Sequence, residues 1–210
     1  MAENDSDSAE TGRLLALAGA GDRAAFNQLF DRYRPLMFRS AERRLSPRVR
    51  PRLDASDVVQ DTHLEAFQRL GGFLRRRPMS FRLWLLKTLH ERLLKIERRH
   101  LAAARRSVDR EVPLPDASSM DLARNFASRV SSPSAPVRRE ELARRIRVIL
   151  AKLSETEREI ILLRNFDGLS NREVACLLEL NPEATKKRYS RALLRLESLM
   201  RKNGLTEPGP

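Results

Sequence analysis

The stretch LSNREVACLLELNPEAT, residues 169–185, contains two helix starts that are separated by a tight turn. Ser170 and Glu173 have the spacing of a capping box, in which each side chain accepts a hydrogen bond from the backbone N–H of the other residue. After the short helix that follows, Asn181 stands at the N-cap of a longer helix and Pro182 at its first position. A short helix, a tight turn and a capped long helix are the plan of a helix-turn-helix.

The long helix, which we expect to run to about Met200, separates apolar from basic side chains by face. The N-terminal part of a recognition helix meets base edges, and flanking cations meet phosphates. An ordinary solvated basic face is the plainer alternative. A further capping box, Ser154 with Glu157, opens the preceding helix, and three capped helices in this order favour DNA binding. The candidate DNA contacts are Arg172, Glu183, Thr185, Lys186, Lys187, Arg188, Ser190 and Arg191.

The whole chain is strongly basic. Its 210 residues include 41 Lys and Arg against 28 Asp and Glu, a formal net charge of +13. Such a charge favours a polyanionic partner, and nucleic acid is the commonest one. A membrane surface is the rival partner, but no apolar run approaches the roughly 18 residues of a membrane-spanning helix, and neither end carries a lipidation signal. We therefore expect no membrane insertion.

The N-terminal sequence MAENDSDSAETG is acidic, whereas a signal peptide starts with basic residues and continues with an apolar stretch. Cys176 is the single cysteine, so the chain has no disulfide framework. Its apolar neighbours predict a small core residue rather than a reactive thiol. Together these features predict a cytoplasmic protein.

The N-terminal half also shows helical spacing, and alternating strand patterns are nearly absent. Asp22 is the expected cap of a long helix, and Asp54 with Asp57 resembles a capping box for the next one. Gly71-Gly72 is expected to end that helix, and Ser80 to cap a further helix. The buried faces of the first two helices are expected to hold Phe26, Leu29, Phe30, Tyr33 and Met37, and Val58, Thr62, Ala66 and Leu70.

These patterns predict an all-α protein with two small helical domains that are joined by a flexible linker, the C-terminal domain being the helix-turn-helix. The linker is predicted from its proline and serine content. The expected divisions are an acidic disordered tail over 1–12, a first domain over 13–105, a linker over 106–137, a second domain over 138–203 and a tail over 204–210.

Residues 75–110 hold twelve basic side chains, and Phe73, Met79, Phe81, His90 and His100 lie within and beside this cluster. This combination suits single-stranded or opened DNA, because cations track the backbone and pockets receive the bases. Trp84 is interpreted as core, whereas Phe73–Ser80 is expected to be a loop that contacts nucleic acid. The candidate residues are Phe73, Arg75, Arg76, Arg77, Ser80, Lys87, His90, Glu91, Lys95, Arg98 and Arg99.

Asp57, Asp61 and Glu65 are four residues apart and form an acidic stripe on a predicted helix, with Gln60 beside it. Acidic groups do not help to hold DNA, so the stripe is expected to serve something else. A solvated face is one interpretation and a protein-docking face the other. A metal site is disfavoured, because carboxylates in a helical row do not surround an ion and no His or Cys completes a set.

Catalysis on nucleic acid would need carboxylates around a metal, or a nucleophile with a base. His63, His90 and His100 are scattered and form no such constellation. We therefore predict that the chain is not an enzyme and that it uses no metal and no cofactor.

Four motifs in this order resemble the short, extracytoplasmic-function (ECF) type of bacterial RNA polymerase sigma factor in the sigma-70 family. They are DASDVVQDT (54–62), FRLWL (81–85), LSNREVA (169–175) and KKRYSRA (186–192). The resemblance covers nearly the whole chain outside the acidic tail and the linker.

The resemblance implies a sigma factor that binds core RNA polymerase and directs promoter-specific transcription initiation. The face with Asp57, Gln60 and Asp61 would then dock on the clamp helices of the largest polymerase subunit. Residues of about 73–99 would open and read the −10 element, and the helix-turn-helix would read the −35 element. The implied partners are core polymerase, including its flap region, promoter DNA both duplex and melted, and an anti-sigma factor.

One position departs from the family pattern. Glu179 stands where the turn usually has glycine, and if it is left-handed the missing glycine costs on the order of 1 kcal/mol.

The alternative function is a stand-alone helix-turn-helix regulator, which would leave the acidic stripe and the basic stretch without a role. A regulator of that kind is expected to bind duplex promoter DNA unaided.

Overall fold

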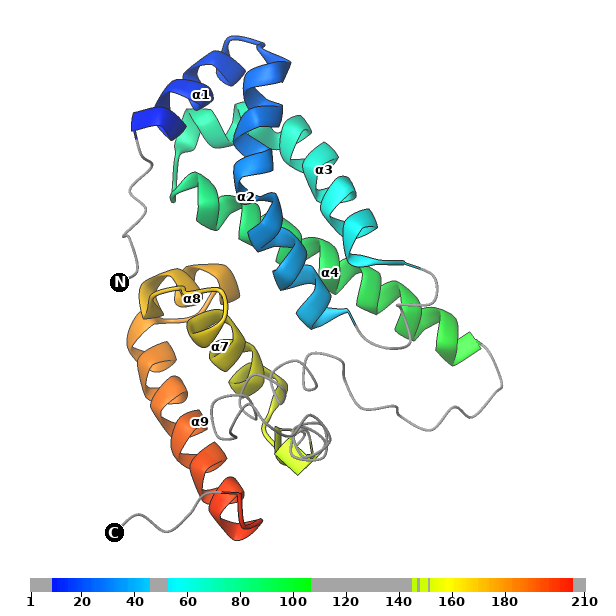
Figure 1. Ribbon diagram of the computed structural model, residues 1–210, viewed down its shortest axis with the longest axis vertical. Helices are drawn as coiled ribbons and strands as arrows, with labels where there is room; N and C mark the ends of the chain where they lie inside the picture. Colours follow the sequence, from blue (N-terminus) through cyan, green and yellow to red (C-terminus); the bar gives the residue numbers. More distant parts are fainter. Residues whose placement is uncertain (1–8, 46–52, 107–144, 147, 151, 206–210) are drawn as a thin grey trace, which may run out of the picture. The chain divides into compact units, whose positions relative to one another are not determined.

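The computed structural model describes residues 9–45, 53–106, 145–146, 148–150 and 152–205 (Figure 1). The chain divides into two compact units, the N-terminal unit within Met1–Val112 and the C-terminal unit within Pro113–Pro210. The described residues form α-helices and no strands, so the predicted all-α class is confirmed. The helices of the first unit are α1 (Ala9–Gly19), α2 (Arg23–Arg44), α3 (Ala55–Arg76) and α4 (Phe81–Arg106); those of the second are α7 (Glu155–Asn165), α8 (Asn171–Leu178) and α9 (Pro182–Lys202).

In the N-terminal unit, α2, α3 and α4 pack against one another and α1 lies mainly on α2 (Figure 1). The predicted caps are confirmed: the Asp22 side chain accepts from Ala25, and Asp54 with Asp57 forms a capping box. The core consists of apolar side chains from all four helices, and the two predicted buried faces are confirmed. The largest fully buried side chains here are Phe26, Phe81, Leu15, Leu29, Met37, Leu85 and Leu89.

Helix α3 does not end at Gly71-Gly72, as the sequence predicts, but continues to Arg76. Glycine in a helix interior costs about 1 kcal/mol relative to alanine, but burial of Phe73 against Phe81 offsets this cost because it removes a large apolar side chain from water. The helix ends instead at Arg77, which adopts the left-handed conformation with φ of 36°. Tertiary packing thus overrides the local glycine signal.

The sequence predicts a disordered tail over residues 1–12, but helix α1 begins at Ala9, so residues 9–12 are helical. Thr11 is buried, with its hydroxyl 3.5 Å from the hydroxyl oxygen of Tyr33. Glu10 pairs with Arg13 at 2.8 Å. Residues 1–8 of the predicted tail lie outside the described residues, as does the predicted linker beyond Arg106, where α4 ends.

In the C-terminal unit, α7, α8 and α9 surround a core that also includes the helical residues Ile146, Ile149 and Leu150. The capping boxes Ser154–Glu157 and Ser170–Glu173 are both present. Asn181 caps α9 through two hydrogen bonds, from the backbone N–H groups of Glu183 (2.9 Å) and Ala184 (3.3 Å). The predicted helix-turn-helix is therefore formed by α8 and α9.

Cys176 is exposed, so its prediction as a core residue is wrong. The helical period of α8 directs Val174, Ala175 and Leu177 inward and leaves Cys176 on the opposite face. Within the part of the chain that the structure describes, none of the helices has the length and apolar character that crossing a bilayer requires.

The turn between α8 and α9 contains Glu179, which like Arg77 is a left-handed residue other than glycine, with φ of 56° and ψ of 41°. Because a side chain is strained in this conformation, we expect Glu179→Gly to raise the free energy of unfolding of the C-terminal unit by about 1 kcal/mol. Hydrogen–deuterium exchange of the α8 and α9 amides in the full chain measures this unit separately.

Glu197→Gly, in the interior of α9, is the matched control. It is expected to lower the free energy of unfolding by about 1 kcal/mol, because glycine is a poor helix former. Faster amide exchange in Glu179→Gly than in the wild type would show that the turn is not strained.

Candidate nucleic-acid interfaces

Helix α9 carries a group of exposed polar side chains on its N-terminal half. All but one of its predicted DNA-contacting residues are exposed. The exposed ones are Glu183, Lys186, Lys187, Arg188, Ser190 and Arg191. The exception is Thr185, which is fully buried and donates a hydrogen bond from Oγ1 to the carbonyl of Asn181 at 3.0 Å. Thr185 is therefore a packing residue, because its position in the first turn faces the core of the unit, and its prediction as a DNA contact is wrong.

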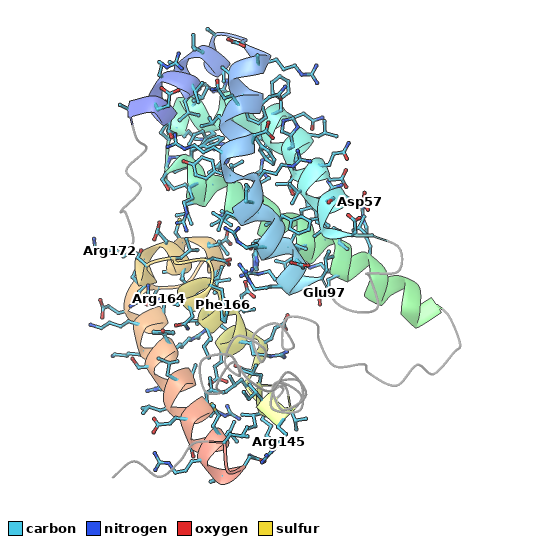
Figure 2. All side chains as sticks on the ribbon, in the orientation of Figure 1. Asp57, Glu97, Arg145, Arg164, Phe166 and Arg172 are labelled. Atoms are coloured by element: carbon cyan, nitrogen blue, oxygen red, sulfur yellow. The ribbon has the colours of Figure 1, made fainter. Side chains whose placement is uncertain are left out.

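Arg172 is exposed in the first turn of α8 and projects away from the unit (Figure 2). Ser170, which caps this helix, and Glu173 satisfy the first backbone N–H groups by hydrogen bonds of 2.7 and 3.2 Å. The position of Arg172 beside a helix N-terminus matches that of a phosphate contact at the first helix of a helix-turn-helix.

The orientation of α9 is fixed by contacts of Tyr189 that the sequence does not reveal. The Arg164 guanidinium lies 5.2 Å from the centroid of the Tyr189 ring, a cation–π contact. The Tyr189 hydroxyl donates to Asn165 Oδ1 at 3.2 Å, and Arg164 also donates to the carbonyl of Leu169 (Figure 2 labels Arg164). These bonds join α9 to α7 and to the loop before α8, so the basic face of α9 is presented at a fixed angle.

A second contact between α7 and α9 is made by Glu157. Its carboxylate accepts hydrogen bonds from the Ser154 backbone N–H at 2.8 Å and from Arg195 at 3.3 Å. Partial burial alone would raise the pKa of Glu157, but the hydrogen bonds from Ser154 and the charge of Arg195 lower it below its ordinary value. The same side chain therefore caps α7 and holds the middle of α9.

In the N-terminal unit, exposed cations lie in two places, at the end of α3 and on the later turns of α4. Arg75, Arg76, Arg77, Lys95, Arg98 and Arg99 are exposed, whereas Lys87 and His90 are partly buried. These side chains come from segments about twenty residues apart in the sequence, and the packing of α3 against α4 places both segments in one body.

The sequence predicts that Phe73 lies in a loop that contacts nucleic acid, but the structure places it in helix α3. It is buried near the end of α3, where its ring stacks on Trp84 with centroids 4.6 Å apart, and it meets Phe81 edge to face. Ser80 serves as the cap of α4 and accepts from the Leu83 backbone N–H at 3.3 Å. These aromatic contacts exclude water, so Phe73 is a core residue and supplies no surface for a base.

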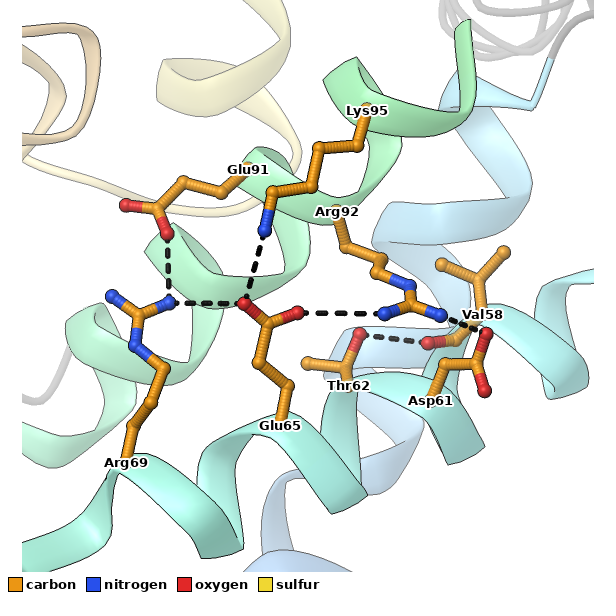
Figure 3. Close-up of polar contacts among 8 residues, drawn as sticks. All are labelled: Val58, Asp61, Thr62, Glu65, Arg69, Glu91, Arg92 and Lys95. Carbon is orange, nitrogen blue, oxygen red and sulfur yellow. Dashed lines mark hydrogen bonds and ion pairs between the residues drawn. The ribbon is translucent and has the colours of Figure 1, made fainter. Parts of the chain in front are cut away.

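Two of the three carboxylates of the acidic stripe on α3, those of Asp61 and Glu65, are neutralised by cations within the unit. Asp61 and Glu65 both pair with Arg92 of α4, and Glu65 also pairs with Lys95 at 3.3 Å and Arg69 at 3.2 Å (Figure 3). Arg69 donates in turn to Glu91 at 2.8 Å, which raises the pKa of Arg69. We call these six residues the α3–α4 ion-pair network: Asp61, Glu65, Arg69, Glu91, Arg92 and Lys95.

The network leaves the three predicted docking residues in different environments. Asp57 is exposed but accepts a hydrogen bond from the Asp54 backbone N–H at 3.1 Å as part of the capping box (Figure 2 labels Asp57). Gln60 is exposed, and Asp61 is held by Arg92 with 40% of its side chain exposed. Two apolar side chains, Leu64 and Phe67, are exposed further along the helix. This surface of α3 is therefore polar and apolar rather than strongly anionic.

His63 is not arranged as a catalytic or metal-binding group. Its ring packs on Phe26 and Phe30, and its Nε2 lies 3.0 Å from Asn27 Oδ1. Burial lowers the pKa of His63. Within the described ranges, no group of His, Cys, Asp and Glu side chains is placed to hold a metal ion.

Two family models match the chain, one described as sigma-70 region 2 over residues 29–106 and one as sigma-70 region 4 over residues 143–196. The RNA polymerase sigma factor CnrH of Cupriavidus metallidurans is 32% identical over 188 residues, which cover 89% of this chain and 92% of that protein. The ECF RNA polymerase sigma-E factor of Escherichia coli is 29% identical over 184 residues, covering 85% and 88%.

Solved structures show the same fold. A structure of CnrH in complex with the cytosolic domain of CnrY has a TM-score of 0.59 at 27% identity and covers 90% of this chain and 96% of that one. A sigma factor RpoE in complex with the anti-sigma factor NepR from Bartonella quintana also has a TM-score of 0.59, at 22% identity, and covers 84% and 96%.

The lowered pKa of Glu157 predicts a pH dependence of stability. Its contribution is complete above the ordinary value of 4.5 and is lost as the pH falls through the lower folded value. We expect Glu157→Gln to be less stable than the wild type at neutral pH, and the difference to shrink as the pH falls through that range. Urea denaturation followed by circular dichroism at each pH measures both chains.

Arg195→Gln removes one of the bonds to Glu157 and is expected to show an intermediate pH dependence. A constant difference between Glu157→Gln and the wild type at every pH would show that the charge of Glu157 contributes nothing to folding.

Proposed function

The chain belongs to the sigma-70 family as a sigma factor of the ECF type, and from this premise we propose which of its surfaces bind core RNA polymerase and which bind promoter DNA. It is a transcription initiation factor that directs polymerase to promoters, and not an enzyme. A stand-alone regulator is not favoured, because region 2 is matched as well as region 4. The observation that carries the proposal is that each of two separately packed units has exposed cations of its own.

The C-terminal unit is proposed to read the −35 element as duplex DNA. The exposed residues at the start of α9 enter the major groove, where Glu183 and Lys186 face base edges and the later cations bind phosphates. The proposed contacts are Arg172, Glu183, Lys186, Lys187, Arg188, Ser190 and Arg191. Thr185 and Tyr189 hold the helix against the rest of the unit, and the exposed Arg195 pairs with Glu157 of α7.

The N-terminal unit is proposed to bind the −10 element and to hold its non-template strand open. Its exposed cations at the end of α3 and along α4 suit the backbone of a single strand. The proposed contacts are Arg75, Arg76, Arg77, Lys87, His90, Lys95, Arg98 and Arg99. Phe73 leaves the predicted set because its ring is buried in the core. Ser80, which caps α4, and Glu91, which pairs with Arg69, are partly exposed and stay predicted contacts.

The exposed face of α3 is proposed to dock on the clamp helices of the largest polymerase subunit, with Asp57, Gln60 and Asp61 as contacts. The polymerase flap region is proposed to contact the C-terminal unit. An anti-sigma factor is proposed as a regulatory partner, because CnrH and RpoE have been solved as complexes with CnrY and NepR. The proposed site of action is the cytoplasm, where polymerase and promoter DNA are found.

Transcription in vitro tests the function as a whole. Core polymerase with the full chain is incubated with genomic DNA fragments, and the 5′ ends of the transcripts are sequenced. We expect a set of defined start sites that core polymerase alone does not give. Start sites no more specific than those of core alone would contradict the proposed function.

Lys187→Ala tests the role of α9 in the same assay. Because the lost contact is to a phosphate, we expect weaker initiation, a larger loss at low salt, and a salt slope that is smaller by about 0.9. Lys202→Ala, at the far end of α9, is the control and is expected to initiate as the wild type does. Equal losses in the two variants would place the DNA contacts elsewhere.

Gln60→Arg tests the docking face, because a cation at an exposed position of α3 would repel or obstruct a cationic partner. We expect at least tenfold weaker binding to core polymerase in a competition assay against wild-type chain, on the order of 1.4 kcal/mol. Gln68→Arg makes the same charge change two turns further along α3 and is expected to have a smaller effect. Affinity equal to that of the wild type in Gln60→Arg would exclude this face as the docking surface.

A further inference from the structure

The α3–α4 ion-pair network joins two surfaces that the proposed function assigns to different partners. Its three carboxylates and three cations are balanced in charge, and five of the six side chains keep between 28% and 56% of their surface exposed. Glu65 is the exception, with 16% of its side chain exposed, and it pairs with all three cations (Figure 3).

Two residues of the network occupy positions that the partners are proposed to use. Asp61 belongs to the proposed docking face, but in the free chain Arg92 neutralises it. Lys95 belongs to the proposed −10 surface, but in the free chain its ammonium lies 3.3 Å from Glu65. Each partner therefore competes with an ion pair inside the protein.

The charges of the network favour the release of Arg92 and Lys95 when Asp61 binds polymerase. If a cation of the polymerase takes Asp61, Arg92 keeps only Glu65, which it must then share with Lys95 and Arg69. Glu91 stays paired with Arg69, so Glu65 is left to balance both Arg92 and Lys95, and these two cations gain from binding phosphate instead. Ion pairs between partly exposed side chains contribute little to stability, so they can be exchanged without unfolding the unit.

We propose that the α3–α4 ion-pair network couples polymerase docking to DNA binding. Docking on Asp61 displaces Arg92, and Arg92 with Lys95 then binds the backbone of the opened strand. By thermodynamic linkage, the DNA strengthens polymerase docking by the same factor. This inference rests on the proposed function for the two surfaces, and it assigns to Arg92 and Glu65 the role of positioning residues.

Glu65→Gln tests, in the absence of polymerase, whether the ion pairs of Glu65 keep cations of α4 from binding DNA. The full chain is titrated against a fluorescent mixed-sequence single-stranded oligonucleotide at several salt concentrations. We expect the variant to bind more tightly than the wild type, and its salt slope to be steeper by about 0.7, because Lys95 is released to a phosphate while Asp61 still holds Arg92 and Glu91 still holds Arg69.

Glu97→Gln is the matched control, because it makes the same charge change on α4 outside the network (Figure 2 labels Glu97). Its salt slope is expected to change less than that of Glu65→Gln. If Glu65→Gln and Glu97→Gln gain equally in affinity with the same slope, the network is only a structural brace and the coupling is refuted.

Arg92→Gln tests the polymerase side of the coupling, and it decides the question even if Glu65→Gln does not fold. Binding of the full chain to core polymerase is measured without DNA. We expect about threefold tighter binding than the wild type, because Asp61 is freed for its partner. Arg82→Gln, which makes the same charge change on α4, is the control.

Equal affinities of Arg92→Gln and Arg82→Gln for core polymerase would overturn the coupling. The two failures are distinguishable, because the oligonucleotide titration needs no polymerase, whereas failure of the proposed function shows as non-specific start sites with the wild-type chain.

Discussion

The packing of α3 against α4 is the constraint on which the N-terminal unit depends. At one end, the rings of Phe73, Phe81 and Trp84 pack together, and this packing allows α3 to continue beyond Gly71-Gly72 to Arg76. Further along, Arg92 and its partners join the solvent-facing sides of the same helices. The helix proposed to face polymerase and the helix proposed to face DNA are thereby parts of one body, so a change at either surface reaches the other through defined side chains.

The C-terminal unit depends on a different device, which is capping by side chains. Two capping boxes and the Asn181 cap fix where α7, α8 and α9 begin, and Arg164 and Asn165 hold α9 through Tyr189. The turn between α8 and α9 has no glycine, and Glu179 accepts the strain of a left-handed backbone. The direction of the basic face of α9 is therefore set by the Asn181 cap and by the contacts of Tyr189 with α7.

The sequence predicts what is local and misses what is tertiary. Capping boxes were predictable because their two residues are three apart, and the helical class because apolar spacing is a local pattern. The extension of α3 to Arg76 depends on a pocket formed by α4, which local glycine signals do not report. The neutralisation of Asp61 by Arg92 joins residues thirty-one apart, so a reading of charges along one helix finds an acidic stripe where the folded unit has balanced pairs.

Cleavage of DNA from a reagent tethered to Cys176 tests most directly that two units of one chain read separate promoter elements within polymerase. Cys176 is the single cysteine and is exposed on α8, beside the proposed −35 surface. Iron–EDTA is attached there, and permanganate marks unpaired thymines on the same DNA. With core polymerase, we expect cleavage around −35, upstream of and separate from the reactive thymines. Cleavage that overlaps the reactive thymines, or the same cleavage pattern with the free chain, would contradict it.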